Sequence, residues 1–232
     1  MQELQAIYRD LSTAHVADAC MRAGVPARCA PSGLRPVLPG AHVVGRALPA
    51  QHSGSVDVFL EALEHAVPGD VLVVDDGGRA DRACVGDLVA LEAARAGLAG
   101  IVIWGLHRDT RELREVGLPV LSLGTSPSGP ASVEPQRPDA LEVARLGEHA
   151  VTRDDLVLAD DDGAILVPLA RASDVAEAAA SIRDTERRQA AAMRAGSSLR
   201  EQVRFRDYLD ARRDRGIGFR EHLRDAGGAI EE

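Results

Sequence analysis

The chain has 232 residues, of which 45% are hydrophobic and only 3% aromatic, so we expect one large domain with an appendage and an aliphatic core. A formal net charge of −9 disfavours a nucleic-acid-binding surface. No apolar run approaches the length of a membrane-spanning helix, and the first residues lack a signal-peptide pattern, so a cytoplasmic protein without membrane contact is expected.

The N-terminal quarter of the chain predicts three helices and one strand. Two helices are expected over 2–24, the second beginning near Thr13. The following segment, 26–39, is rich in Pro and Gly and is expected to be a loop. A strand over 42–50 and a helix over 56–64 complete this part of the chain.

A strand–helix–strand unit follows. The apolar run 71–75 predicts a buried strand, and 87–96 is a good helix former that Gly86 opens and Gly97 closes. The second apolar run, 98–104, predicts another buried strand. The order favours a parallel pair of strands joined by a crossover helix.

Charged residues follow the two strands of this unit, and we expect them to lie close together in the fold. Asp87 begins the helix, and Arg108 and Asp109 follow the second strand. Because the helix begins where the first strand ends, these residues are expected to meet at the carboxyl edge of the sheet, where open α/β folds bind ligands. The alternative is that Asp87 only caps the helix and that Arg108 and Asp109 form a surface turn.

The chemistry of this group suits a small acid that carries a carbonyl. A helix N-terminus offers backbone N–H groups to an anion. Arg108 offers a planar fork of donors for a carboxylate or a developing enolate oxygen. Asp87 and Asp109 supply the hard oxygen ligands that Mg²⁺ and Mn²⁺ prefer.

The absence of lysine restricts the mechanism, since all 27 Lys+Arg residues are Arg. A Schiff-base enzyme needs a lysine amine, so a class I aldolase and an enzyme with a lysine-bound pyridoxal phosphate are excluded. A lysine-bearing phosphate loop is excluded for the same reason. A carbanion formed by this protein must be stabilised by a metal or by hydrogen-bond donors.

Beyond the unit, the pattern predicts a short helix over 110–116, a strand over 119–124 and a loop over 125–138. The segments 156–159 and 164–167 predict a β-hairpin. The hairpin turns at an Asp-Asp-Asp-Gly sequence, in which Gly supplies the positive φ.

The C-terminal part changes in character. A long helix is expected over 174–195, with an apolar stripe at Val175, Ala179, Ile182, Ala190 and Met193. Glu186 falls on this stripe, where a carboxylate needs a partner or a wet site. The plain alternative is an i,i+3 pair with Arg183. Most of the Phe and Tyr residues lie in the tail, 199–232, which favours docking on another subunit.

The cysteines and histidines show no metal-binding spacing. Cys20, Cys29 and Cys84 form no CxxC motif, so a disulfide framework or a zinc site is not expected. Cys84 is interpreted as a small residue packed in a tight loop, with a reactive thiol as the alternative. The seven histidines form no HxH or HExxH pattern, although His52 follows a strand and could line the pocket.

Twenty residues separate Asp87 from the Arg108-Asp109 pair, and this D-x20-R-D pattern inside a strand–helix–strand unit resembles the RraA-like family. The loop Gly86-Asp-Leu-Val89 and the segment Leu156 to Pro168 also resemble that family. The resemblance covers about residues 8–170 and extends weakly into the tail.

The resemblance implies a fold and an assembly. The expected fold is α/β, an RraA-like αββα-type sandwich similar to the swivelling phosphohistidine domains, with a C-terminal helical extension. The catalytic domain would span 1–172, and the extension, 173–232, would pack on a neighbouring subunit. Members form homotrimers or hexamers (dimers of trimers), with the active site at a subunit boundary.

The resemblance also implies residue roles. Asp109 would bind the divalent metal, Mg²⁺ or Mn²⁺, directly or through water, and Asp87 would help to hold the water shell of that metal. Arg108 would bind the keto oxygen of the substrate and stabilise the pyruvate enolate.

Two further roles follow from the resemblance. The loop that begins at Gly86 would bind the pyruvyl carboxylate through the backbone N–H groups of Asp87, Leu88 and Val89. Glu186 is the candidate for a proton-transferring glutamate that a neighbouring subunit contributes.

The activity implied is that of the class II pyruvate aldolases, which act on 4-hydroxy-4-methyl-2-oxoglutarate and related acids and often decarboxylate oxaloacetate. One alternative is a non-catalytic regulator that binds an endoribonuclease complex, and such members are expected to lack the aspartate after the arginine. A second alternative is a lyase for a different 2-oxo acid. The residue before Arg108 supports this second alternative, because a small or apolar residue is expected there and the chain has His107. The histidine could contact a distinct substrate tail; the other interpretation is that it only packs or points to solvent.

Overall fold

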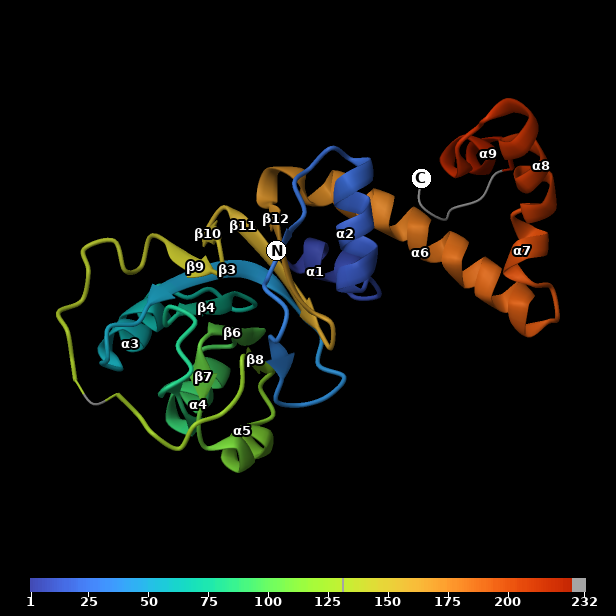
Figure 1. Cartoon of the computed structure of the whole chain (residues 1–232). Helices are drawn as coiled ribbons and strands as arrows, with labels where there is room; N and C mark the ends of the chain where they lie inside the picture. Colours follow the sequence, from blue (N-terminus) through green and yellow to red (C-terminus); the bar gives the residue numbers. More distant parts are fainter. Residues whose placement is uncertain (131, 227–232) are drawn as a thin grey trace. The chain divides into compact units, whose positions relative to one another are not determined.

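In the computed structural model, which describes residues 1–130 and 132–226, the Val- and Leu-rich segments form an eight-stranded curved sheet (Figure 1). The strands, in the order in which they lie, are β1 (Arg28–Cys29), β12 (Gly163–Pro168), β11 (Asp155–Asp160), β3 (Val43–Gln51), β4 (Val71–Asp75), β6 (Gly100–Trp104), β8 (Val120–Ser122) and β2 (Arg35–Pro36). The central strands β3, β4, β6 and β8 are parallel, and the flanking strands are antiparallel to their neighbours.

Both faces of the sheet are buried, which explains why its central strands are almost continuously apolar. In β4, Leu72 and Val74 contact the core formed with helices α3 (Asp57–Glu64), α4 (Asp87–Arg95) and α5 (Thr110–Val116). On the other face, Val71 and Val73 join a second core, to which a hairpin of β9 (Ala144–Leu146) and β10 (His149–Val151) contributes.

A second, very short parallel pair of strands positions the site. It consists of β5 (Ala83–Val85), which directly precedes α4, and β7 (Leu106–His107), which lies between β6 and α5 (Figure 1). The pair extends the strand–helix–strand unit beyond the carboxyl edge of the large sheet.

Two short helices, α1 (Gln2–Tyr8) and α2 (Thr13–Arg22), begin the chain as predicted. The Ser12 side chain caps α2 by accepting a hydrogen bond from the His15 backbone N–H at 3.2 Å. The Tyr8 hydroxyl is buried and donates to the Ala172 carbonyl at 2.8 Å, which ties the first helix to the segment after β12.

The α/β fold with a helical C-terminal region is confirmed, and most predicted elements lie within two residues of the observed ones. The short strands were not predicted: β1 and β2 interrupt the predicted loop over 26–39, and β5, β7, β9 and β10 are additional. Gly163 adopts φ 137° at the hairpin turn, as predicted.

The chain divides into two compact units, Met1–Ala176 and Glu177–Glu232, and helix α6 (Ala172–Arg194) runs through the division. The second unit continues with α7 (Leu199–Gln202), α8 (Phe205–Arg215) and α9 (Phe219–Ala226). Within the described ranges, no helix combines the length and apolar character that crossing a membrane requires.

The aromatic residues of the tail pack on one another. The Tyr208 and Phe219 ring centroids are 4.8 Å apart, and Phe205 meets Phe219 edge-on at 5.9 Å. His222 Nε2 lies 2.8 Å from the Val203 carbonyl oxygen and anchors α9. The aromatic residues of the tail therefore form a small local core, and docking of the tail on another subunit stays a prediction.

Candidate active site

The β5–β7 pair brings the two halves of the predicted site together. Arg108 continues from β7, and its backbone N–H donates to the Val85 carbonyl at 2.9 Å. Gly86 and Asp87 follow Val85 at the start of α4, whereas Asp109 precedes α5. Asp109 adopts a left-handed conformation with φ 58°, which is uncommon for a residue other than glycine and recurs at functional sites.

The side chain of Asp109 is the centre of the cluster. Its Oδ2 lies 3.4 Å from the Asp87 backbone nitrogen and 3.3 Å from Arg108 Nε. Gly86 makes this approach possible, because a Cβ atom at that position would lie 2.3 Å from Oδ2 of Asp109. The prediction that Asp87, Arg108 and Asp109 meet at one place is therefore confirmed.

The N-terminus of α4 already attracts carboxylates. Gly86 is the N-cap residue, and Asp87 is the first residue of the helix, which corrects the alternative that Asp87 is the cap. Asp87 Oδ1 accepts a hydrogen bond from the Leu88 backbone N–H at 2.8 Å. Two first-turn N–H groups thus face acidic side chains, as expected for the positive end of a helix dipole.

A cavity of about 260 Å³ adjoins this helix end. Asp87, Leu88, Val89 and Arg108 are among its lining residues, so every element of the predicted carboxylate-binding loop borders one space. The Arg108 side chain is half-exposed, and Gly129 lies over it, since a Cβ there would come within 2.8 Å of Nη1. A small acid can therefore reach the guanidinium and the helix end together.

The donor set fits a hard divalent cation. Asp109 and Asp87 provide carboxylate oxygens on the open side of the cluster, where the Asp109 side chain is 35% exposed. Mg²⁺ and Mn²⁺ bind through one or two carboxylates and retain several water ligands, which requires such access.

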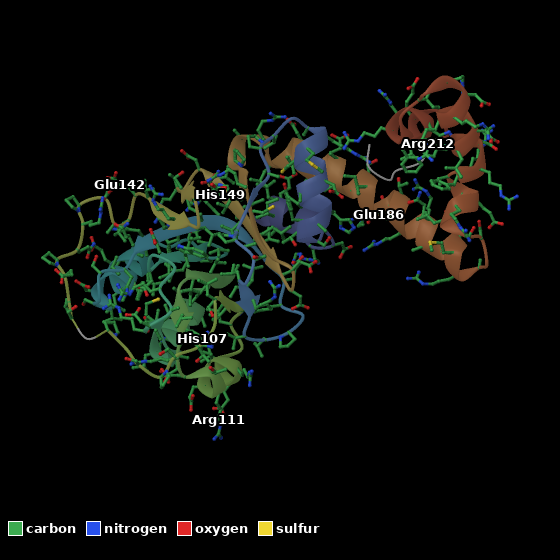
Figure 2. The ribbon with its side chains drawn as sticks, viewed as in Figure 1. His107, Arg111, Glu142, His149, Glu186 and Arg212 are labelled. Carbon is green, nitrogen blue, oxygen red and sulfur yellow. The ribbon has the colours of Figure 1, made fainter. Side chains whose placement is uncertain are left out.

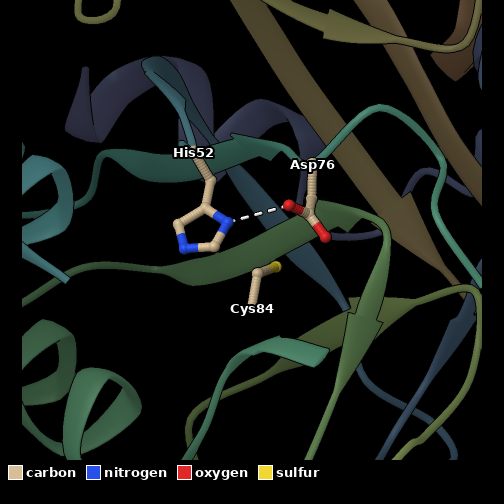
Figure 3. A group of neighbouring side chains, drawn as sticks. All are labelled: His52, Asp76 and Cys84. Carbon is tan, nitrogen blue, oxygen red and sulfur yellow. Dashed lines mark hydrogen bonds and ion pairs between the residues drawn. The ribbon is translucent and has the colours of Figure 1, made fainter. Parts of the chain in front are cut away.

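A second group of polar side chains lies beside the site (Figure 3), and two of its members, His52 and Cys84, line the same cavity. His52 follows β3, Asp76 follows β4, and Cys84 lies in β5, and their potential ligand atoms all lie within 4.8 Å of one another. His52 Nδ1 and Asp76 Oδ1 are 2.8 Å apart. Burial and the nearby Asp76 charge raise the pKa of the Cys84 thiol well above its usual range.

The His52 prediction is confirmed, because His52 lines both the 260 Å³ cavity and an adjoining cavity of about 400 Å³. Asp76 was missed, although it directly follows a strand parallel to the one that precedes His52. The carboxyl ends of parallel strands meet at one edge, and that rule could have linked the two residues. The lining of the larger cavity is mixed in charge, with three arginines (Arg79, Arg82, Arg137) and three acidic residues (Asp75, Asp76, Glu134).

His107, labelled in Figure 2, is buried, and both of its ring nitrogens lie within hydrogen-bonding distance of hydroxyl groups of the protein. Nδ1 lies 2.7 Å from Ser122 Oγ, and Nε2 lies 3.0 Å from Thr110 Oγ1. Burial lowers the pKa of the imidazole below its ordinary value of 6.5. The packing interpretation is therefore confirmed, and His107 does not line the cavity beside Arg108.

Glu186 lies on α6 in the second unit and is exposed (Figure 2). Its place on the apolar stripe does not bury it in the chain, and Met193 on the same stripe is 48% exposed, which corrects the predicted extent of the stripe. Arg183 pairs with Asp184 at 2.8 Å. The role of Glu186 in proton transfer stays a prediction.

Comparison with known proteins gives consistent matches. The family model described as "RraA-like: Aldolase/RraA" matches residues 13–166. A Halalkalibacterium halodurans protein provisionally named 4-hydroxy-4-methyl-2-oxoglutarate aldolase is 32% identical over 64% of this chain and 70% of its own length. The 4-hydroxy-4-methyl-2-oxoglutarate aldolase of Thermus thermophilus is 38% identical over 47% of this chain and 65% of its own length.

Solved structures agree in fold. Streptomyces coelicolor RraAS2, described as an unusual member of the RNase ES inhibitor RraA protein family, matches with a TM-score of 0.70 and 33% identity over 81% of this chain and 95% of that chain. An uncharacterized Pseudomonas syringae protein matches with a TM-score of 0.75 over 87% of this chain and 96% of that chain, at 24% identity.

Proposed function

Because the chain belongs to the RraA-like family, we propose that it is a lyase that cleaves a carbon–carbon bond of a 4-hydroxy-2-oxo acid to release pyruvate, with Mg²⁺ or Mn²⁺ as cofactor. The names of the relatives support an aldolase. The observation that carries the proposal is the convergence of the α4 N-terminus, the Arg108 guanidinium and the Asp109 carboxylate, since the helix end and Arg108 line one cavity and Asp109 contacts both of them.

The carboxylate of the pyruvyl group binds at the start of α4 in this proposal. The backbone N–H groups of Asp87, Leu88 and Val89 are the donors, and the helix dipole favours the negative charge. The side chains of Asp87 and Asp109 lie near two of these donors, so they must turn aside when the substrate enters. Asp87 and Asp109 would hold the divalent cation with these side chains, and its charge would offset that of their carboxylates.

Arg108 binds the keto oxygen. Its fork can donate to an oxygen that gains charge as the carbon–carbon bond breaks and the enolate forms. A donor aimed at developing charge is worth about 2.7–4 kcal/mol in the transition state. Oxaloacetate gives the same enolate when it loses carbon dioxide, so decarboxylation of oxaloacetate is part of the proposal.

The aspartates hold the metal. Asp109 would bind it directly or through water, and Asp87 would orient its water ligands. The bound cation supplies positive charge that stabilises the enolate. The catalytic part of the chain is residues 1–172 in this proposal, which lie within the compact unit Met1–Ala176.

A complete site also needs a proton-transferring group, and the proposal assigns this role to Glu186 of a neighbouring subunit in a homotrimer or a dimer of trimers. Its exposure on α6 supports the assignment. Light scattering on the purified chain measures the assembly. Mixing Glu186→Gln with Arg108→Ala chains then tests a shared site: restored activity supports it, and activity no higher than in either variant alone contradicts it.

The direct test is pyruvate release from 4-hydroxy-4-methyl-2-oxoglutarate and from oxaloacetate. We expect release that depends on Mg²⁺ or Mn²⁺ and stops with a chelator. Release no faster than that caused by the metal alone, with both acids, would remove the proposal.

A second candidate function is the inhibition of an endoribonuclease, because RraAS2 belongs to a family described by that activity. The presence of Asp109 favours the lyase, since regulators are expected to lack this residue. Inhibition of purified RNase ES by the chain, without pyruvate release, would support the regulator. A different 2-oxo acid is not favoured by His107, whose ring nitrogens face Ser122 and Thr110.

A further inference from the structure

His52, Asp76 and Cys84 lie beside the proposed site, and the proposed mechanism uses none of them. His52 and Asp76 directly follow two strands and Cys84 lies within a third, and together they gather a ring nitrogen, a carboxylate and a thiol within 4.8 Å (Figure 3). Their spacing along the chain matches no metal-binding motif, so only the fold brings them together.

Asp76 carries the strongest indication of a ligand. Its side chain and that of His52 are each only 2% exposed. One carboxylate oxygen, Oδ1, faces His52 Nδ1, but Oδ2 is buried and has no hydrogen-bond partner among residues 1–130 and 132–226. A buried carboxylate oxygen without a partner is costly, and such groups are rare in folded proteins. The Cys84 thiol is the neighbouring group that could share a ligand with it.

We propose that His52, Asp76 and Cys84 bind a transition-metal cation of the Zn²⁺ class, at a site separate from that of Asp109. Nitrogen, sulfur and carboxylate oxygen are the ligands that Zn²⁺ prefers, whereas Mg²⁺ prefers oxygen alone. Three protein ligands leave a fourth position for water or a small ligand, as in catalytic zinc sites.

The geometry requires only small shifts. Zinc ligands at about 2.0–2.3 Å from the metal lie roughly 3.5 Å apart in a tetrahedron. His52 Nδ1 and Asp76 Oδ1, now 2.8 Å apart, must therefore separate slightly, and a pair near the 4.8 Å limit must close by about 1 Å. The cation would replace the contact between His52 Nδ1 and Asp76 Oδ1, with the ring proton on Nε2. The Cys84 thiol would give its proton to the solvent as the metal–sulfur bond forms.

The cluster is also reachable. His52 and Cys84 line the 260 Å³ cavity, and His52 and Asp76 line the 400 Å³ cavity, which gives the metal a path from solvent. The site therefore forms part of the wall of the proposed pyruvate pocket, but it shares no ligand with Asp87 or Asp109.

Cobalt is the probe for the test, because Co²⁺ takes zinc sites and its bond to a thiolate gives a charge-transfer band. The full chain is freed of metal with a chelator and titrated with Co²⁺ in excess Mg²⁺. We expect one Co²⁺ per chain with a thiolate band that Zn²⁺ displaces and Mg²⁺ does not. The absence of that band would overturn the proposal.

Variants assign the ligands. Cys84→Ser should abolish the band, and Asp76→Asn should keep it while the affinity for Co²⁺ falls at least tenfold. Cys29→Ser, which removes an exposed cysteine, should keep both the band and the affinity. A band that persists in Cys84→Ser, or that disappears in Cys29→Ser, would overturn the site.

Two further measurements test this metal site independently of the lyase proposal. Asp109→Asn should keep the cobalt band even where pyruvate release is lost, so failure of the lyase proposal leaves this result intact. Zn²⁺ should raise the Tm of the wild type and of Cys29→Ser but not that of Cys84→Ser. If Cys84→Ser does not fold, His52→Gln takes its place, and a wild-type Co²⁺ affinity in His52→Gln would refute the site.

Discussion

Substitution of Gly86 by alanine should disturb the geometry of the candidate site strongly while it changes the stability of the fold only slightly. The backbone of Gly86 has φ −129° and ψ −169°, which alanine adopts without strain. The new Cβ would lie 2.3 Å from Asp109 Oδ2 and 3.2 Å from Arg108 Nε. Since ordinary contacts begin near 3.4 Å, the carboxylate must move by about 1 Å. A misplacement of that size costs about 10²-fold in rate, or roughly 2.7 kcal/mol.

The effect on folding should be smaller. Alanine is a poorer N-cap than glycine by about 0.5–1 kcal/mol, which lowers Tm by roughly 1–4 °C in a chain of this size. The assays are pyruvate release with Mg²⁺ and thermal unfolding by circular dichroism. Gly86→Ser is the matched variant: it restores a capping hydroxyl but keeps the Cβ, so its stability should recover while its activity stays low.

Gly117→Ala controls for instability alone. Gly117 ends α5 with φ 76°, and a Cβ there has nothing within 4 Å, so alanine adds only backbone strain of about 1–2 kcal/mol. This variant should lose stability and keep its activity. Wild-type kcat/KM in Gly86→Ala would refute the reasoning, because the close approach of Asp109 to the α4 N-terminus would then be irrelevant to catalysis.

Three further predictions follow from single side chains. Arg108→Lys keeps the charge but loses the planar fork, so kcat/KM for pyruvate release should fall about 10²-fold, whereas Arg111→Lys on the exposed face of α5 should have no effect. Because burial lowers the pKa of His107 from 6.5, the unfolded chain binds a proton before the folded chain as the pH falls. The free energy of unfolding should therefore decrease below about pH 6.5, and His107→Gln should show a shallower decrease in urea titrations; equal slopes would contradict this. Arg46→Ala leaves the Asp70 carboxylate, 2% exposed, without its bidentate partner and should cost about 2–3 kcal/mol in the same titrations, and a loss below about 1 kcal/mol would contradict the pairing.

The sequence predicted the long, strongly periodic elements because their burial is regular. Helices α3, α4 and α5 each bury one apolar face, and β4 is buried on both faces, so hydrophobic spacing alone reveals them. Strands of two or three residues, such as β5 and β7, are too short to show any period. They form because the fold brings two segments beyond the large sheet side by side, where their backbone groups can hydrogen-bond to each other. The local sequence does not encode this pairing.

The candidate site was predictable where connectivity alone decides it. A crossover unit must return Arg108 and Asp109 to the helix end that Asp87 begins, and the structure shows this contact. The grouping of Asp76 with Cys84 depends on the path of the short strand β5, which the spacing does not encode. The exposure of Glu186 was missed for another reason: helical spacing identifies a stripe but not how far along the helix it stays covered.

The measurement that tests the central claim most directly is pyruvate release from oxaloacetate by the wild type and Asp109→Asn, with Mg²⁺ and with chelator. The matched control is Glu112→Gln, which removes an exposed carboxylate from the first turn of α5. We predict metal-dependent release by the wild type and by Glu112→Gln, and a loss of at least about 10²-fold in Asp109→Asn. Metal-dependent release by Asp109→Asn at the wild-type rate would contradict the account.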